Sequence, residues 1–243
     1  MKRLEDAGAV LVAKLSTGEL AGGDVWFGGQ TKNPWKPEEG SSGSSTGPAS
    51  PTAAGCVAFA IGAETGGSIV GPSTRCGVYG LRPTYGRVSR YGVMTLAGSL
   101  DKAGPLCRSV EDCALVLHAL HGPDDKDLTV ADLPFNWDAA LDVKKLRVGY
   151  FKAAFDEPRA VPQEKGNDAE ALDRIRSLGV TLQPIEFPDY PIRDLLALMY
   201  TEFSAAFDDL TRSKRDSLLT RQGRASDANL YRTNRFVPAV EYI

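Results

Sequence analysis

The chain has 243 residues, of which 42% are hydrophobic and 24% are charged, and its net charge at pH 7 is −3. This composition is typical of a globular protein large enough to bury a sizeable core, and the acidic balance argues against a nucleic-acid partner. No apolar run approaches the roughly 18 residues of a transmembrane helix, and the N-terminus is too acidic and its apolar run too short for a signal peptide. We therefore expect a cytoplasmic protein with no membrane partner.

Glycine divides the chain unevenly, because 21 of the 25 glycines lie in residues 1–122. The first part should hold short strands and turns, with a long loop over residues 18–47. Its predicted helices cover residues 2–7, 48–55 and 109–120, the last with Ser109 as N-cap. Its predicted strands cover residues 9–13, 57–61, 78–81 and 93–96.

The second part begins with a polar linker over residues 123–132. Strands are predicted over 146–150 and 180–185, with an amphipathic helix over 167–178 between them, and residues 191–219 should be mostly helical. Strand, helix and strand in this order predict a βαβ unit that extends the same sheet. We therefore divide the chain into residues 1–122 and a helix-rich continuation of the same domain, residues 123–243.

Two glycine-rich turns carry the chemistry that this sequence suggests. Ser44 lies in Gly43–Gly47, and Ser68 directly follows Gly66 and Gly67. Glycine allows a tight turn, so a serine there can be exposed beside free backbone N–H groups, as a nucleophile and its oxyanion hole require. A flexible linker is the alternative, but the apolar stretch between the turns argues for order.

A serine hydroxyl needs a base, and the histidines do not offer a convincing one. His118 and His121 are the two histidines, and both fall at the end of the helix predicted over 109–120. Capping that helix end is the expected role, rather than a Ser-His-Asp triad or a metal site. Ser99 and Lys102 have the Ser-x-x-Lys spacing of penicillin-recognising enzymes, without the partner motifs of that class.

The cysteines predict a reduced setting. None of the four forms a CxxC pair, so we expect buried thiols in a cytosolic protein and no metal site. They are Cys56, Cys76, Cys107 and Cys113.

Three stretches of the sequence form one recognisable pattern. The main stretch reads GSSTGPASPTAAGCVAFAIGAETGGSI over residues 43–69, and GGQTKNPWKP precedes it over 28–37. The third stretch, over 77–112, reads GVYGLRPTYGRVSRYGVMTLAGSLDKAGPLCRSVED. Together they resemble the amidase signature family of serine hydrolases, and the resemblance extends over roughly residues 5–122. It implies an α/β fold of three layers, α/β/α, around a mixed central sheet, which in this chain would be incomplete at both ends.

The resemblance also implies roles for particular residues. Ser68 matches the nucleophile, and Ser44 matches a bridging serine that relays the proton and follows a cis peptide bond from Gly43. The N–H groups around Thr65, Gly66 and Gly67 match the oxyanion hole, and no metal or organic cofactor is implied. Ser45 is expected to hydrogen-bond locally and to have no catalytic role.

The chain departs from the family pattern at several positions. The family's catalytic lysine lies in a segment several tens of residues before the Gly/Ser loop, so no lysine of this chain is assigned that role. Lys14 resembles a later family lysine, Lys32 and Lys36 should be solvated, and Lys102, expected after the sheet, is the one outside candidate. Glu64 and Val70 stand where many members have Asp and Arg. The C-terminal residues read as the start of a continuing helix, as in a piece of a longer protein.

The expected function is hydrolysis of a carboxylic amide to an acid and an amine or ammonia through an acyl-Ser68 intermediate. The expected partner is a small-molecule amide, and a homo-oligomer is left open. One alternative is a truncated or degenerate homologue without turnover, which the absent lysine favours. Another is an amidotransferase subunit that delivers ammonia to a charged tRNA and needs partner chains.

Overall fold

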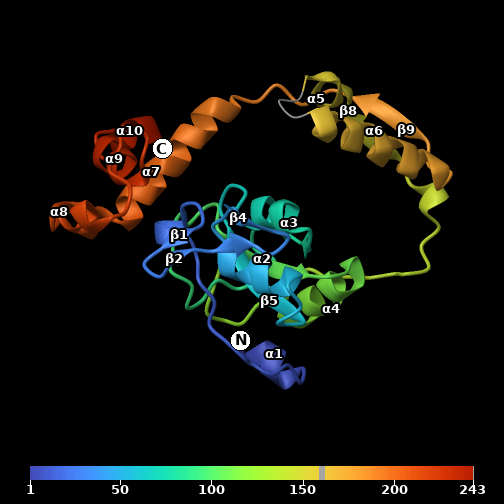
Figure 1. Cartoon of the computed structure of the whole chain (residues 1–243), viewed down its shortest axis with the longest axis horizontal. Coiled ribbons are helices and arrows are strands. Elements are labelled where there is room, and N and C mark those ends of the chain that lie inside the picture. The colour runs from blue at the N-terminus through green and yellow to red at the C-terminus, as the bar shows by residue number, and fades with distance from the viewer. Residues whose placement is uncertain (159–161, 243) are drawn as a thin grey trace. The chain divides into compact units, whose positions relative to one another are not determined.

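The computed structural model describes residues 1–158 and 162–242 (Figure 1). The chain divides into two compact units. The first consists of Met1–Phe135 together with Arg193–Ile243, and the second of Asn136–Ile192.

A three-stranded sheet forms the centre of the first unit. Its strands are β5 (Phe59–Glu64), β7 (Lys102–Cys107) and β6 (Tyr79–Gly80), in the order β5-β7-β6 with antiparallel pairing. The sequence pattern did not predict β7, because a central strand rarely contains proline, which has no N–H to donate. Here Pro105 contributes its carbonyl instead, which accepts a hydrogen bond from Leu81 N at 2.9 Å.

Helices cover both faces of this sheet, which confirms the predicted α/β fold. On one face Ala103 and Cys107 of β7 belong to a core cluster with α4 (Val110–Leu120) and with Leu4 of α1 (Lys2–Asp6). On the other face Leu106 packs with α2 (Thr46–Ala53) and α3 (Val70–Cys76). The alternation of side chains along β7 therefore separates two helical layers.

Both ends of α4 are capped, as the sequence predicts. Ser109 Oγ accepts a hydrogen bond from Asp112 N at 3.0 Å, and His121 Nδ1 lies 2.8 Å from the carbonyl oxygen of His118. Arg3 adds a cation that the sequence pattern does not predict, because its guanidinium donates to the carbonyls of Leu120 and Gly122. A cation at this end also complements the helix dipole.

Two of the predicted strands are wrong. Residues 9–13 form no strand, and Val10 and Val12 are 82% and 71% exposed, because this apolar stretch pairs with no other strand in the described ranges. Residues 93–96 are irregular, with bends at 93 and 96, and the N–H of Leu96 donates to the Asp101 carboxylate at 2.8 Å instead of to a neighbouring strand.

The long loop contains more structure than predicted. Residues 18–47 include two small antiparallel pairs and a 3-10 turn before α2 begins. These elements are η1 (Glu19–Ala21), β1 (Val25–Trp26), β2 (Gly29–Gln30), β3 (Lys32–Asn33) and β4 (Lys36–Gly40).

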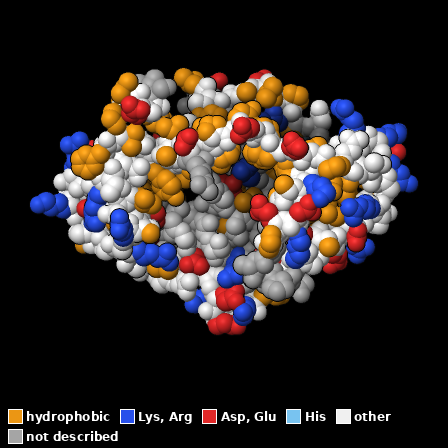
Figure 2. All heavy atoms as spheres, turned by 90° about the horizontal axis from the view of Figure 1, so that it is seen from above, with side chains coloured by type: hydrophobic (Ala, Val, Ile, Leu, Met, Phe, Trp, Pro, Cys, Tyr) orange, Lys and Arg blue, Asp and Glu red, His pale blue; other side chains and the backbone are white. Residues whose placement is uncertain are grey.

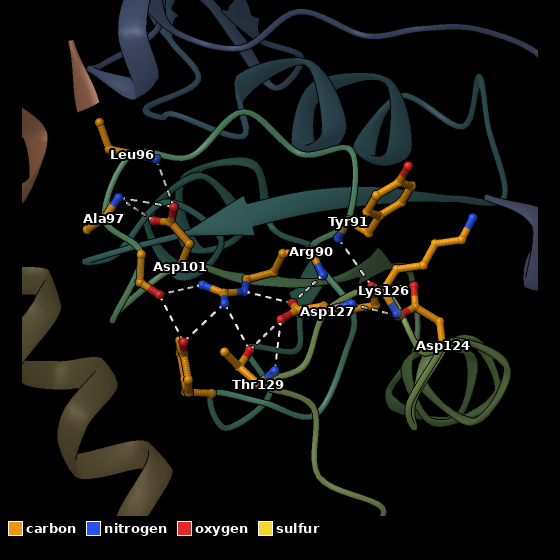
Figure 3. Close-up of polar contacts among 12 residues, drawn as sticks. Arg90, Tyr91, Leu96, Ala97, Asp101, Asp124, Lys126, Asp127 and Thr129 are labelled. Atoms are coloured by element: carbon orange, nitrogen blue, oxygen red, sulfur yellow. Dashed lines mark hydrogen bonds and ion pairs between the residues drawn. The ribbon is translucent and has the colours of Figure 1, made fainter. Parts of the chain in front are cut away.

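The expected linker over residues 123–132 is not a free linker. Asp127 accepts hydrogen bonds from the backbone N–H and the guanidinium of Arg90, and the same guanidinium reaches Thr129 and Gly98 O (Figure 3). Arg87 holds the next residues by donating to the carbonyls of 133 and 134. The segment is therefore tied to residues 87–98 by charged hydrogen bonds.

The C-terminal part of the first unit is helical, as predicted. Met199 and Phe203 of α7 form a cluster with Leu96, Ala97 and Tyr231. Its elements are α7 (Ile192–Ala206), α8 (Asp208–Arg212), η3 (Arg215–Leu218), α9 (Asp227–Asn234) and α10 (Ala239–Tyr242).

The second unit contains the predicted βαβ arrangement. β8 (Val148–Phe151) pairs in parallel with β9 (Leu182–Ile185), and the helix α6 (Pro162–Ser177) lies between them in sequence. The short η2 (Val143–Lys145) and α5 (Lys152–Asp156) flank β8. In the described residues these strands form a two-stranded sheet, and that they extend the β5-β7-β6 sheet stays a prediction.

The surface is mixed in character. On the face drawn in Figure 2, lysine and arginine side chains are interspersed with acidic and hydrophobic ones. Within residues 1–158 and 162–242, no helix combines the length and the apolar character needed to cross a bilayer.

Candidate active site

The two glycine-rich turns lie against each other. Ser45 N donates a hydrogen bond to the carbonyl oxygen of Ser68 at 3.0 Å, and the Ser44 carbonyl accepts one from Gly18 N at 3.0 Å. The Gly43–Ser44 peptide bond is cis, as the family resemblance implies. The fold thus brings the segments of Ser44 and Ser68 together, although a helix and a strand separate them in sequence.

The turn that carries Ser68 leaves three consecutive N–H groups free. It follows β5, and Gly67 adopts φ +118°, a conformation that side chains rarely allow. In the described part of the chain, the N–H groups of Gly66, Gly67 and Ser68 have no hydrogen-bond acceptor. A row of free N–H groups beside a half-buried serine can bind an oxyanion.

Glu64 fixes the far side of this turn. Its Oε2 accepts hydrogen bonds from the N–H groups of Ile69 at 2.7 Å and Val70 at 3.0 Å. Its side chain is fully buried, and Oε1 forms an ion pair with Arg82 at 3.3 Å. The departure from the family's Asp at this position therefore retains a carboxylate, and its Arg82 partner was missed because it lies in an unremarkable loop sequence.

Three serines in and near the turns differ in their partners. Ser45 Oγ donates to Ala63 O at 2.9 Å and accepts from Ala63 N at 3.1 Å, so it hydrogen-bonds to β5, 18 residues away, rather than within its own loop. Ser44 is buried and Ser68 is half-buried. Within the described ranges, neither the Ser44 nor the Ser68 hydroxyl hydrogen-bonds to another residue, so both are free to contact a substrate or a proton donor.

No lysine nitrogen of the described residues hydrogen-bonds to Ser44. Lys32 and Lys36 are exposed, as expected, and Lys36 pairs with Glu39. Lys102 was expected after the sheet, but it is the first residue of β7, and its Nζ donates to the carbonyl of Thr65 at 3.1 Å. Burial lowers the pKa of Lys102, as does the nearby Arg82 cation.

The four cysteines form no disulfide, and most of their thiols are buried. Cys76, Cys107 and Cys113 are buried, whereas Cys56 is exposed, so the expectation of buried thiols is wrong for Cys56. Burial raises the pKa of Cys76 to about 11, which makes it an inert thiol at neutral pH. In the ranges that the structure describes, His, Cys, Asp and Glu side chains form no group that could hold a metal ion.

A cleft and the helix α7 border the two turns. A cleft of about 850 Å³ is lined by Ser42, Val70 and Gly71 among others, next to the start of α3. On another side a Cβ atom added at Gly66 would lie 3.3 Å from Met199 Sδ, so α7 closely approaches the Ser68 turn. Residues from both the N-terminal and the C-terminal part of the first unit therefore surround the site.

Comparison with known families identifies the chain. The family model described as Amidase matches residues 1–240. The chain belongs to the amidase signature family. The glutamyl-tRNA(Gln) amidotransferase A-subunit from Roseiflexus sp. RS-1 is 42% identical over 199 residues, covering 78% of this chain and 40% of that protein. The corresponding protein from Staphylococcus epidermidis is 40% identical over 214 residues, covering 84% and 44%. The chain thus spans less than half the length of these relatives.

Solved structures of other family members have the same fold. The glutamyl-tRNA(Gln) amidotransferase A-subunit of Thermotoga maritima superposes with a TM-score of 0.77 at 32% identity, over 87% of this chain and 47% of that one. A peptide amidase from Stenotrophomonas maltophilia gives a TM-score of 0.72 at 31% identity, over 88% and 47%. The fold is therefore shared with a peptide amidase and with an amidotransferase component alike.

Proposed function

We propose that this chain carries the nucleophile and the proton-relay serine of a serine amidase that hydrolyses a carboxylic amide. The observation that supports the proposal most strongly is the row of free N–H groups at Gly66, Gly67 and Ser68, next to a serine hydroxyl without a partner in the described residues. Gly66 is exposed and Gly67 and Ser68 are half-buried, so these N–H groups are accessible from solution, and three in succession suit a ligand with a negatively charged oxygen.

In the proposed mechanism Ser68 Oγ attacks the amide carbonyl carbon while its proton passes to Ser44, whose own hydroxyl proton moves on to a base. The carbonyl oxygen becomes an oxyanion that the N–H groups of the turn stabilise. The carbon–nitrogen bond then breaks, and the base returns the proton through Ser44 to the leaving amine or ammonia. Water attacks the acyl-Ser68 ester by the same route in reverse, which releases the acid and restores the Ser68 hydroxyl.

The relay requires a titratable base beyond Ser44, since a serine hydroxyl does not hold a proton reversibly near neutral pH. No described lysine nitrogen hydrogen-bonds to Ser44, and we propose that no residue in the described ranges supplies this base. Turnover by these residues alone is then slow or absent, and the alternative of a homologue without catalysis predicts the same result. Labelling of Ser68 separates the two, because it tests the nucleophile without requiring turnover of an amide.

An amidotransferase component is the second candidate function. The curated relatives at about 42% identity carry that name, and such a component would act with partner chains. Glu64 and Val70 stand where many family members have Asp and Arg, so the general amidase is preferred. Ammonia release from glutamine or asparagine that depends on a partner chain would favour the amidotransferase instead. We propose a cytoplasmic location for either function, and the cysteines without disulfides are consistent with it.

The first test replaces the proposed nucleophile. Ser68→Ala should abolish labelling by a fluorophosphonate probe, because the alkylphosphonyl group is transferred to the Ser68 hydroxyl. Mass spectrometry of the labelled peptide identifies the modified residue. Ser217→Ala is the matched control, since Ser217 is exposed and its hydroxyl donates only to the carbonyl of Lys214. Equal labelling of Ser68→Ala and of the unmodified chain would exclude Ser68 as the nucleophile.

A further inference from the structure

Thr65, which precedes Gly66 in the Ser68 turn, is held by two consecutive residues at the start of β7. Its hydroxyl donates to Asp101 Oδ1 at 2.5 Å, and its carbonyl accepts from Lys102 Nζ at 3.1 Å. Asp101 is buried, and its carboxylate also accepts the N–H groups of Leu96 and Ala97, as Figure 3 shows. Thr65 is therefore attached to a carboxylate that is itself fixed by a turn.

The Lys102 contact sets the direction of one N–H group. The Thr65 carbonyl and the Gly66 N–H belong to the same planar trans peptide, so they point in opposite directions. Because the carbonyl faces Lys102, the Gly66 N–H faces away from it, and this N–H has no acceptor in the described ranges. A cation at the carbonyl oxygen also polarises the amide, which strengthens its N–H as a donor.

We propose that Lys102 is a positioning residue for the oxyanion turn, holding the Thr65–Gly66 peptide so that the Gly66 N–H donates to the substrate's carbonyl oxygen. The inference rests on the proposed function, because an oxyanion forms only if Ser68 attacks a carbonyl. Lys102 acts through Thr65 and makes no contact with substrate. It exchanges no proton during turnover.

The charge of Lys102 gives the inference a pH signature. Burial lowers its pKa, as does the Arg82 cation, whereas Glu64 and Asp101 raise it, and the net result lies below the ordinary value of about 10.4. The ammonium form is present below this lowered pKa and is lost as the pH rises through it. The positioning effect should therefore be present below the lowered pKa of Lys102 and should decline as the pH rises through it.

The direct test reads the peptide itself by NMR. In the unmodified chain, the ¹⁵N–¹H resonance of Gly66 and the carbonyl ¹³C resonance of Thr65 should shift with pH as Lys102 deprotonates. Lys102→Met keeps a side chain of similar length but removes the charge, and it should abolish this titration. Lys2→Met is the control, because Lys2 is 84% exposed and pairs only with Asp6, four residues away. Resonances in Lys102→Met that match those of the unmodified chain at every pH would overturn the inference.

The kinetic test follows the rate constant of fluorophosphonate labelling at Ser68, which requires no amide turnover. Lys102→Met should lower this rate constant about 5- to 50-fold, a smaller loss than the roughly 10²–10³-fold cost in kcat of deleting an oxyanion donor. Lys102→Arg should recover most of the labelling rate and should lack the alkaline decline, because arginine stays charged. An unchanged labelling rate in Lys102→Met, or a decline with pH that persists in Lys102→Arg, would contradict the inference.

The two proposals fail in different ways. If the unmodified chain is not labelled at Ser68 by a fluorophosphonate, the proposed function is wrong, while the NMR titration still reports whether Lys102 holds the Thr65–Gly66 peptide. If Ser68 is labelled but the Gly66 resonance does not respond to Lys102→Met, the function stands and this inference is wrong.

Discussion

Ser44 and Ser45 are neighbours in the loop after Gly43, but only the Ser45 hydroxyl has hydrogen-bond partners in the described residues. This difference indicates a structural role for Ser45 and a chemical role for Ser44. Ser45 Oγ bonds to both the N–H and the carbonyl of Ala63 at the outer edge of β5, in place of a further strand. The Ser44 hydroxyl has no partner in the described residues. The sequence Ser44–Ser45 alone does not distinguish them, because either residue could turn toward β5.

Ser45→Ala and Ser44→Ala should therefore have different effects. Ser45→Ala should lower the free energy of unfolding by about 1–3 kcal/mol, since it removes both hydrogen bonds between the buried Ser45 hydroxyl and the backbone of Ala63. Ser44→Ala should change the free energy of unfolding by less than about 0.5 kcal/mol and should slow labelling of Ser68. Urea unfolding and fluorophosphonate labelling measure the two effects. A larger loss of stability in Ser44→Ala than in Ser45→Ala would refute this division.

At the scale of elements, the segment of residues 124–129 folds back against residues 85–98 (Figure 3). The Arg90–Asp127 ion pair has side chains only 16% and 9% exposed, with a nitrogen–oxygen distance of 3.1 Å. Desolvation favours the neutral form of Asp127, but hydrogen bonds from Thr129 and Arg90 outweigh it and hold the Asp127 pKa well below its ordinary range. The carboxylate thus stabilises the folded chain.

This lowered pKa predicts a pH-dependent contribution to stability. The contribution is complete above the unfolded-state pKa of about 3.9 and is lost as the pH falls from there through the lowered folded-state pKa. Asp127→Asn should cost about 1–2 kcal/mol at pH 7, and the difference from the unmodified chain should shrink below about pH 4. Urea unfolding at several pH values measures it. A difference that is constant down to about pH 2 would rule out this role of the carboxylate.

At the scale of the whole molecule, the sheets of the two units differ in how deeply their strands are buried. β7 is a central strand whose residues after Lys102 are all buried, whereas β8 and β9 form a two-stranded sheet in which Phe151 and Ile185 are 36% and 45% exposed. Two-stranded sheets with little buried apolar surface are marginal in water. The first unit should therefore be the more stable of the two.

Native-state hydrogen exchange tests this difference. Amides of β5 and β7 should exchange more slowly than those of β8 and β9, by at least about tenfold, because local opening requires less free energy where fewer apolar contacts break. The comparison uses the whole chain, with intrinsic exchange rates corrected for sequence. Equal protection in the two sheets would show that the two units unfold together.

Features that depend on local chemistry can be recognised from the sequence. Glycine-rich turns, the Ser109 cap, the α/β class and the family motif around Ser44 and Ser68 all follow from neighbouring residues. Where unlike segments meet is known only from the folded chain. Residues 102–107 form a central strand despite Pro105, the apolar residues 9–13 have no strand partner in the described ranges, and Lys102 lies against Thr65. Strand pairing and the electrostatic environment of the half-buried Lys102 amine depend on contacts between residues distant in sequence, and no local pattern encodes those contacts.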